Sequence, residues 1–80
     1  MKAIAYTGAA ARQRAKLDAK VRARIDAKLE AYARSGEGDV KRLTGREGAR
    51  LRVGDWRVIF YEKNGTVIVT AVGHRREIYD

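Results

Sequence analysis

The sequence has no cysteine and no long apolar run, and both absences narrow what the protein can be. Without cysteine, neither a disulfide framework nor a thiolate metal site can form, and such usage is typical of a reducing cytosol. No apolar run approaches the roughly 20 residues that a membrane-spanning helix needs. Met1 and Lys2 do not open a signal-peptide pattern. We therefore expect a cytoplasmic protein with no membrane-spanning segment.

Motifs for metal-dependent or cofactor-dependent chemistry are also missing. There is no glycine-rich phosphate loop followed by Lys-Ser/Thr, no zinc-ligand spacing and no cluster of paired carboxylates with a histidine. Ser35 and His74 are the only serine and histidine, which gives no support to a nucleophilic triad or to a shared metal ion. We expect no metal and no cofactor. Any phosphate chemistry must then depend on positioned side chains and charge stabilisation.

Acidic residues are outnumbered, since ten Asp and Glu stand against eighteen Lys and Arg, for a formal net charge of +8. This charge predicts attraction to a polyanion, which could be nucleic acid, an anionic membrane surface or an acidic protein. Residues 1–40 and 41–80 each carry nine basic and five acidic residues, so the charge is not confined to a tail. Eighty residues predict one small domain spanning 1–80.

The first half of the chain predicts a strand and two helices. Residues 2–6 alternate as a short strand, and Thr7 is a good N-cap for a helix over 8–16. Asp18 begins a second helix, which Gly36 can close. Its apolar stripe consists of Val21, Ile25, Leu29 and Tyr32. Its basic residues, predicted to face solvent, are Lys20, Arg22, Arg24 and Lys28.

The second half predicts an antiparallel meander. Residues 35–48, rich in glycine and charge, are interpreted as a connecting loop anchored by Leu43. Three strands follow at Ala49 to Val53, Trp56 to Glu62 and Thr66 to Gly73, and Asn64-Gly65 is a strong hairpin signal. The predicted fold class is α+β, with an N-terminal strand, a two-helix hairpin and a three-stranded antiparallel meander.

Two-residue turns would set the register and separate the two faces of this sheet. Arg52 then faces Arg57, Leu51 faces Val58 and Val53 faces Trp56. Across the second turn Phe60 faces Val69 and Val58 faces Ala71. The apolar face, expected beneath the helices, carries Leu51, Val53, Trp56, Val58, Phe60, Val67, Val69 and Ala71. The other carries Arg50, Arg52, Arg57, Ile59, Tyr61, Ile68, Thr70 and Val72.

Like charges opposed in a strand pair cost about 0.2–1 kcal/mol, so the arginines on the second face require an explanation. The C-terminal "GHRREIYD" is expected at the same end of the sheet. The candidate site is therefore Arg50, Arg52, Arg57, His74, Arg75, Arg76 and Tyr79. Several guanidinium forks in one place favour a bridging phosphate.

A structural interpretation of the same residues remains open. The strand arginines could pair with carboxylates and solubilise the sheet, the available acids being Glu47, Asp55, Glu62 and Glu77. Tyr79 could pack its ring on the sheet, and His74 could be structural or contact phosphate.

The segment "VKRLTGREGARLRVGDWRVIFYEKNGTVIVTAVGHRREIYD", Val40 to Asp80, resembles toxins of the RelE/ParE superfamily of type II toxin–antitoxin systems. The resemblance implies a helical hairpin packed on a mainly antiparallel sheet, and a cognate antitoxin that wraps the toxin. In the RelE-like branch the implied partners are the ribosome and mRNA, which is cleaved by attack of a 2′-hydroxyl on the adjacent phosphate. The ParE-like branch poisons DNA gyrase instead.

The resemblance also implies roles for individual residues. Arg57 would stabilise the phosphate, Arg75 would follow the last strand as a second catalytic arginine, and Tyr79 would help to activate the attacking hydroxyl. Arg50 and Arg52 stand where well-known RelE toxins carry lysines.

Because arginine effectively cannot lose its proton, Arg50 and Arg52, with Arg76, are expected to bind RNA phosphate and not to act as bases. Tyr79 or His74 would then be the general base. We expect a ribosome-dependent endoribonuclease, with a gyrase inhibitor or a non-catalytic nucleic-acid-binding module as the alternatives. Neither a membrane nor a small-molecule cofactor is expected as a partner.

Overall fold

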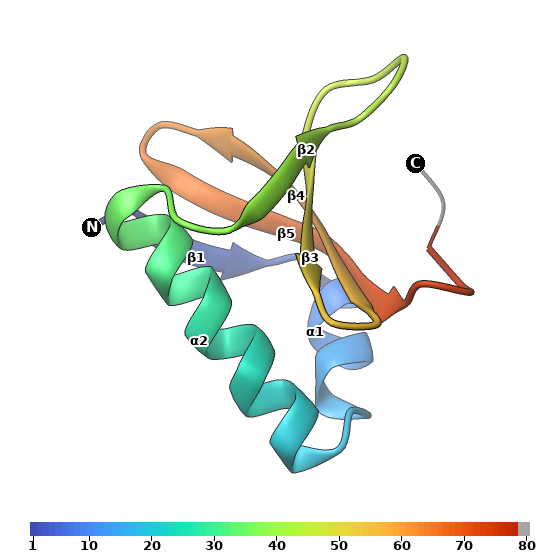
Figure 1. The fold of residues 1–80 in the computed structure, drawn as a ribbon. Helices are drawn as coiled ribbons and strands as arrows, with labels where there is room; N and C mark the ends of the chain where they lie inside the picture. The colour runs from blue at the N-terminus through green and yellow to red at the C-terminus, as the bar shows by residue number, and fades with distance from the viewer. Residues whose placement is uncertain (79–80) are drawn as a thin grey trace.

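The computed structural model describes residues 1–78, in which two helices pack on a five-stranded sheet (Figure 1). The elements are β1 (Ala3–Tyr6), α1 (Gly8–Ala15), α2 (Ala19–Ser35), β2 (Asp39–Arg42), β3 (Ala49–Val53), β4 (Trp56–Lys63) and β5 (Thr66–His74). The strand order is β1-β5-β4-β3-β2, with β1 parallel to β5 and the other pairs antiparallel. The predicted α+β fold class is confirmed. Neither helix of residues 1–78 is long and apolar enough to cross a membrane.

The helices begin and end at the residues that the sequence indicates. The Thr7 hydroxyl accepts a hydrogen bond from the backbone N–H of Ala10 at 3.2 Å, and the Asp18 carboxylate accepts one from the N–H of Lys20 at 3.0 Å. These side chains satisfy amide donors that the first turn of a helix leaves unpaired. Gly36 closes α2 in the left-handed region, at φ 78°, where a glycine carries no steric cost.

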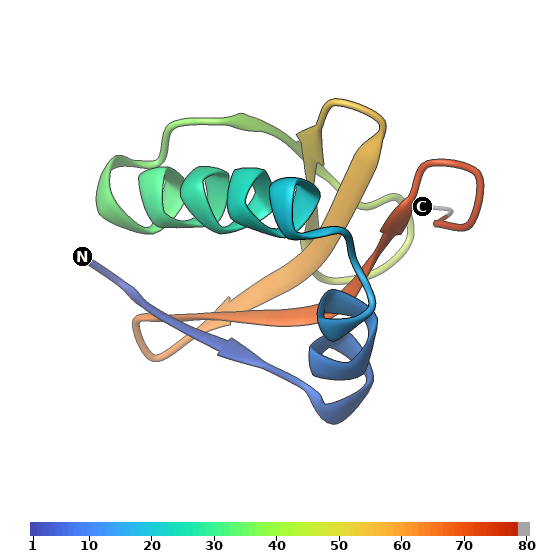
Figure 2. The ribbon, with the colours of Figure 1, turned by 90° about the horizontal axis from the view of Figure 1, so that it is seen from below.

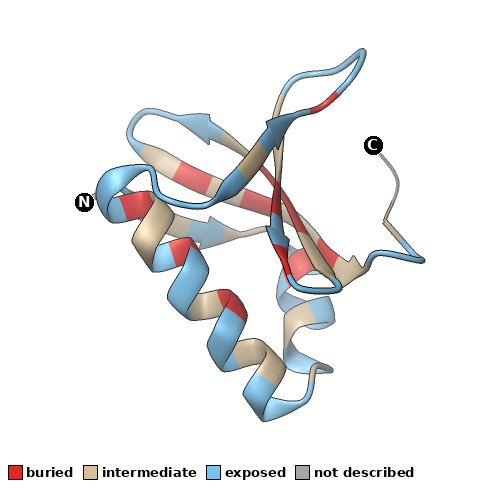
Figure 3. Ribbon diagram, in the orientation of Figure 1, coloured by how far each residue is buried: buried red, intermediate tan, exposed pale blue. Residues whose placement is uncertain are grey.

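The core lies between the helices and one face of the sheet, as Figures 2 and 3 show. Ile25 and Leu29 of α2 are fully buried, together with Ala10 of α1. The sheet contributes Leu51, Val53, Val58, Phe60, Val67, Val69 and Val72. Burial of each large side chain is worth about 1.5–3 kcal/mol, so this layer supplies most of the stability of a domain without disulfides.

The predicted loop over residues 35–48 contains a strand. β2 runs antiparallel to β3, with Val40 opposite Leu51 and Asp39 opposite Arg52. Three of its four residues are exposed and Val40 alone is half-buried, so the segment has no alternating apolar pattern to indicate a strand. Leu43, which follows it, is 8% exposed, and its predicted anchoring role is confirmed.

A β-bulge changes the predicted register between β4 and β5. Phe60 faces Val69 as predicted, but the register then shifts, so that Ile59 faces Ala71 and Val58 faces Val72. The predicted pairing of Val58 with Ala71 is therefore wrong. An extra residue in one strand moves every later side chain to the opposite face. Val72 consequently enters the core at 3% exposure, and Ala71 lies on the outer face, the face away from the helices.

Candidate phosphate-binding site

The candidate arginines gather where two turns meet at one end of the sheet. The Gly54-Asp55 turn joins β3 to β4, and the second turn follows β5. The backbone N–H of Arg75 donates to the carbonyl oxygen of Asp55 at 2.8 Å, and the strand register places Trp56 opposite His74. The chain after the last strand is thus tied to the tip of the β3–β4 hairpin.

Arg57 has a guanidinium held in place by the backbone. It lies directly opposite Arg52, as predicted, and its Nη1 donates to the carbonyl oxygens of Gly54 at 2.8 Å and Trp56 at 2.9 Å. Among residues 1–78, no acceptor is hydrogen-bonded to its Nε or Nη2. One edge of the planar group is therefore fixed, and the other can bind an anion in the two-pronged geometry that phosphate favours.

Two further arginines form long ion pairs with acids. Arg52 Nη1 lies 3.9 Å from Asp39 Oδ2, and Arg75 Nε lies 3.8 Å from Asp55 Oδ1. All four side chains are more than half exposed. Such exposed pairs contribute about 0–1 kcal/mol, so an arriving phosphate can displace the carboxylates at small cost.

The other predicted site residues lie at different places relative to Arg52, Arg57 and Arg75. Arg50 is half-buried on the same strand face as Arg52 and lies opposite Ile59, whereas Arg76 is exposed in the turn after β5. Tyr79 lies outside the described residues.

His74 packs against the hairpin tip and accepts a hydrogen bond. Its ring meets Trp56 edge-on, with centroids 5.4 Å apart, and its Nδ1 accepts from the backbone N–H of Arg76 at 3.2 Å. A ring nitrogen that accepts a hydrogen bond carries no proton, so this contact favours the tautomer with the proton on Nε2. In that form His74 is a hydrogen-bond donor at Nε2, which suits contact with phosphate better than proton abstraction.

The contacts around position 73 explain why a glycine precedes His74. A Cβ at this position would lie 3.1 Å from Cγ1 and 3.2 Å from Cδ1 of Ile78. The absence of a side chain therefore lets the C-terminal segment fold back onto the end of β5. Ile78 therefore packs on β5 at the position that pairs with Arg57.

Comparison with known protein families decides the broad class of the molecule. Residues 2–79 match the family described as "ParE toxin of type II toxin-antitoxin system, parDE". The chain belongs to this toxin family. A search of curated protein sequences found no significant match.

Solved toxin structures share the fold. The RelB–RelE antitoxin–toxin complex from Methanococcus jannaschii matches at 25% identity and a TM-score of 0.76, over 94% of each chain. The RelBE2 complex from Mycobacterium tuberculosis matches at 22% identity and 0.80, over 92% of this chain and 98% of that one. The isolated E. coli RelE toxin matches at 19% identity and 0.81, over 92% and 84%. This protein is therefore a type II toxin with a RelE-like fold.

Helix α2 of the toxin adds a residue to the site that sequence reasoning assigned only to solvent. Arg24 Nη2 lies 3.2 Å from the place that a Cβ on Gly54 would occupy, so the guanidinium stands against the hairpin tip. Arg24 and Arg57 thus approach the same turn from α2 and from β4. Helical periodicity could not indicate this, because it does not relate α2 to a turn 30 residues later.

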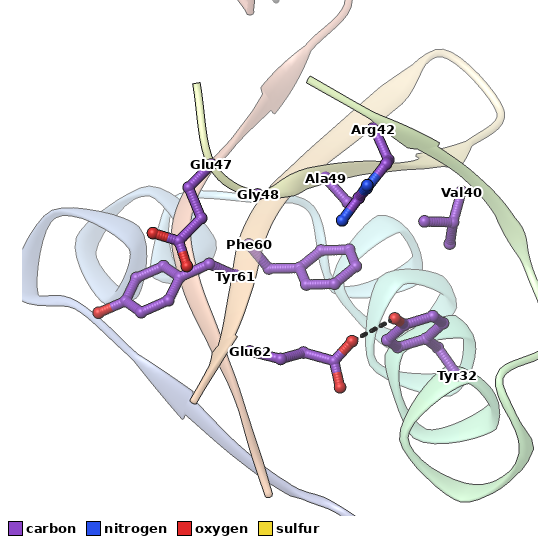
Figure 4. A pocket seen from close by; sticks show the side chains of 9 residues that line it. All are labelled: Tyr32, Val40, Arg42, Glu47, Gly48, Ala49, Phe60, Tyr61 and Glu62. Carbon is purple, nitrogen blue, oxygen red and sulfur yellow. Dashed lines mark hydrogen bonds between the residues drawn. The ribbon is translucent and has the colours of Figure 1, made fainter. Parts of the chain in front are cut away.

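A pocket of about 280 Å³ lies apart from the arginines of the toxin, between the C-terminal half of α2 and strands β2 to β4 (Figure 4). Across it the Tyr32 hydroxyl donates to Glu62 Oε2 at 2.6 Å, and the ammonium group of Lys2 also contacts Glu62. Burial, followed by this hydrogen bond to the carboxylate, raises the pKa of Tyr32 to about 12. The hydrogen bond from Lys2 is the main cause that lowers the pKa of Glu62. This network ties the N-terminus and α2 to β4.

Proposed function

We propose that the toxin is a ribosome-dependent, metal-independent endoribonuclease that cleaves mRNA. The 2′-hydroxyl oxygen would attack the adjacent phosphorus, the P–O5′ bond would break, and the products would be a cyclic phosphate and a 5′-hydroxyl. The observation that carries this proposal is the guanidinium of Arg57, which two backbone carbonyls hold with one edge directed away from them. The proposal also draws on the resemblance of residues 40–80 to RelE-like toxins.

The arginines supply the electrostatic part of this chemistry. Negative charge on the phosphate oxygens increases as the 2′-oxygen attacks, and donors fixed beforehand stabilise that charge without reorganising. Arg57 would form a bidentate contact, while Arg52 and Arg75 would exchange their distant carboxylates for phosphate oxygens. Arg50, Arg76 and Arg24 would contact the neighbouring backbone phosphates.

Tyr79 and His74 are proposed to have separate roles in the reaction. Tyr79 is proposed as the group that activates the 2′-hydroxyl. His74, with its proton on Nε2, is proposed to donate a hydrogen bond to a phosphate oxygen, because its contact with Arg76 disfavours a role as base. A water molecule polarised by the arginines would give the departing 5′-oxygen its proton.

Primer extension on mRNA in a reconstituted translation reaction tests the proposal. We expect cuts that require ribosomes, that disappear with Arg57→Ala and Tyr79→Phe, and that fall strongly with Arg57→Lys, which keeps the charge but lacks the fork. Arg34→Ala, an exposed arginine in the last turn of α2, is the matched control and should cut like the wild type. Intact message from a folded protein that still arrests growth would reject the ribonuclease.

A second candidate function is inhibition of DNA gyrase, which the name of the matching family favours. A gyrase inhibitor needs no group that activates a 2′-hydroxyl. If toxicity survives the loss of both Arg75 and Tyr79, and purified gyrase accumulates cleaved DNA in the presence of the toxin, this candidate replaces the ribonuclease.

A cognate antitoxin is proposed as the protein partner. Similar structures include RelB–RelE complexes, and a chain with a net charge of +8 is suited to an acidic partner. Co-expression with the protein encoded beside the toxin should relieve growth arrest and give a co-purifying complex. Persistent arrest with no complex would reject that protein as the antitoxin.

A further inference from the structure

Two side chains support the backbone at the β-bulge in β5. Thr70 is the extra residue, because the residues on either side of it pair with two successive residues of β4. Such an insertion interrupts the ladder of backbone hydrogen bonds. The Thr70 hydroxyl donates to the carbonyl oxygen of Ile59 at 3.3 Å. The second side chain comes from α1, where Oε1 of Gln13 accepts a hydrogen bond from the backbone N–H of Val72 at 2.8 Å.

The hydrogen bond to Gln13 depends on the register that the bulge creates. β1 pairs with β5 as far as Val69, and the carbonyl oxygens of Gly65 and Val69 accept hydrogen bonds on this edge. α1 follows β1 and lies beside the end of β5 (Figures 1 and 2). Because backbone groups alternate between the two sides of a strand, regular alternation would direct Ala71 to this edge and the N–H of Val72 toward β4. The bulge reverses the alternation and directs the Val72 N–H to Gln13.

The register after the bulge, here called the bulged register, decides which residue lies opposite Arg57. In the bulged register this residue is Gly73. The pairing next to the hairpin turn, continued without a bulge, would put Val72 there instead. A Cβ at position 73 would lie 3.1 Å from Cγ1 of Ile78, so a valine at this place would displace the C-terminal segment. The proposed activating residue, Tyr79, directly follows Ile78 in the sequence.

The bulged register also places the residues that follow β5. His74 pairs with Trp56, and the N–H of Arg75 donates to the carbonyl oxygen of Asp55 at 2.8 Å. Without the bulge, His74 would come opposite Asp55 and Arg75 would pass the hairpin tip. Arg75 would then lose the backbone contact that ties it to this tip.

We infer that Gln13 is a positioning residue for the proposed ribonuclease, an inference that rests on that proposed function. Its side-chain oxygen selects the bulged register of β5, and this register places Arg75 and the C-terminal segment around Arg57. Gln13 acts through the backbone of Val72 and not through contact with the phosphate. Burial of Val72 favours the same register, and without Gln13 it would do so against a backbone N–H that has lost its acceptor.

Three substitutions on α1 isolate the effect of this side-chain oxygen. Gln13→Met keeps the length of the side chain and a good helix former but lacks the oxygen, whereas Gln13→Glu keeps an oxygen acceptor. Ala11 is exposed, and a position two residues away points to the opposite side of a helix. Ala11→Met is therefore the matched control.

NMR measures the register without any RNA. Because the Val72 N–H points to α1, Val58 and Val72 form a pair without mutual hydrogen bonds, in which the two Hα atoms are close. The wild type should show an NOE between these atoms. Gln13→Met should weaken it, add one from Val58 to Ala71, and make amide exchange at Val72 about tenfold faster. Gln13→Glu and Ala11→Met should resemble the wild type.

Primer extension in the reconstituted translation reaction measures the consequence for cleavage. Gln13→Met should lower kcat about tenfold and change KM by about twofold or less, because it misplaces the reacting groups but removes no contact with RNA. Gln13→Glu should restore kcat to within about threefold of the wild type, since its carboxylate oxygen accepts the same N–H. Ala11→Met should cut like the wild type.

The outcomes separate this inference from the ribonuclease proposal. Wild-type register and kcat in Gln13→Met overturn the inference even if Tm falls, because the side chain then contributes to stability alone. A changed register with unchanged cutting also overturns it and leaves the ribonuclease standing. No cutting by the wild type rejects the ribonuclease and, with it, the role of Gln13 in the reaction, while the NOEs still report its effect on the register. Loss of register and kcat in Gln13→Met, with recovery in Gln13→Glu, supports both.

Discussion

Threonine substituted at two adjacent positions of β5 gives a sharp test of the bulge on which the outer face depends. Val72 is 3% exposed, whereas Ala71 is half-buried on the outer face. Val72→Thr keeps the shape of the side chain and places a hydroxyl in the core, where an unsatisfied hydroxyl costs about 1–3 kcal/mol. Ala71→Thr places the same side chain beside solvent on a strand, where the expected change is within about 0.5 kcal/mol.

This difference is large for a domain of this size. At roughly 0.05–0.15 kcal/mol per residue, the whole chain is expected to have about 4–12 kcal/mol of unfolding free energy. At about 4–8 °C per kcal/mol, Val72→Thr should lower Tm by about 4–24 °C. Ala71→Thr should change Tm by no more than a few degrees.

Urea unfolding followed by the fluorescence of Trp56, the only tryptophan, measures both variants. The slope with urea should match the wild type, so that a shift in midpoint reports stability alone. If Ala71→Thr proves the more destabilising variant, β5 alternates without a bulge. The outer face described above would then be incorrect.

Three further predictions concern stability and ionisation. Gly48→Ala should lower the unfolding free energy by about 1–3 kcal/mol, because its φ is +113° and a Cβ would lie 2.8 Å from a carbonyl oxygen of β4. Gly45→Ala, which has open space around it, should lower the unfolding free energy less in the same urea experiment. Equal losses in the two variants would contradict the close contact at Gly48. In an ultraviolet titration Tyr32 should ionise near pH 12, and Glu62→Gln should move its pKa toward 10. An unchanged pKa would exclude Glu62 as a cause of the raised value. Because the pKa of Glu62 is lowered in the folded state, its contribution to stability is present above the ordinary carboxyl pKa and is lost as the pH falls through the lowered value. Lys2→Met should reduce this dependence of the unfolding free energy on acid pH. An identical pH profile would contradict the role of Lys2.

Signals within a few residues of each other predicted the helix ends and turns, because short-range contacts fix these features. Thr7, Asp18 and Gly36 mark helix ends through contacts within a few residues, and Asn64-Gly65 marks a hairpin, so their positions could be found without a structure. The opposition of Arg52 and Arg57 followed from a two-residue turn in the same way. Motif resemblance added the family, which the match over residues 2–79 confirms.

Features that depend on contacts between distant segments could not be found in this way. β2 has one half-buried residue and exists as a strand because β3 offers it an edge. Arg24 reaches the hairpin tip because α2 packs across the sheet. Sequence alone therefore determined the helix ends, the turns and the residues that carry charge. The tertiary structure decided the bulge, the edge strand and the side chains that meet at the site, because each depends on packing between segments that no local period relates.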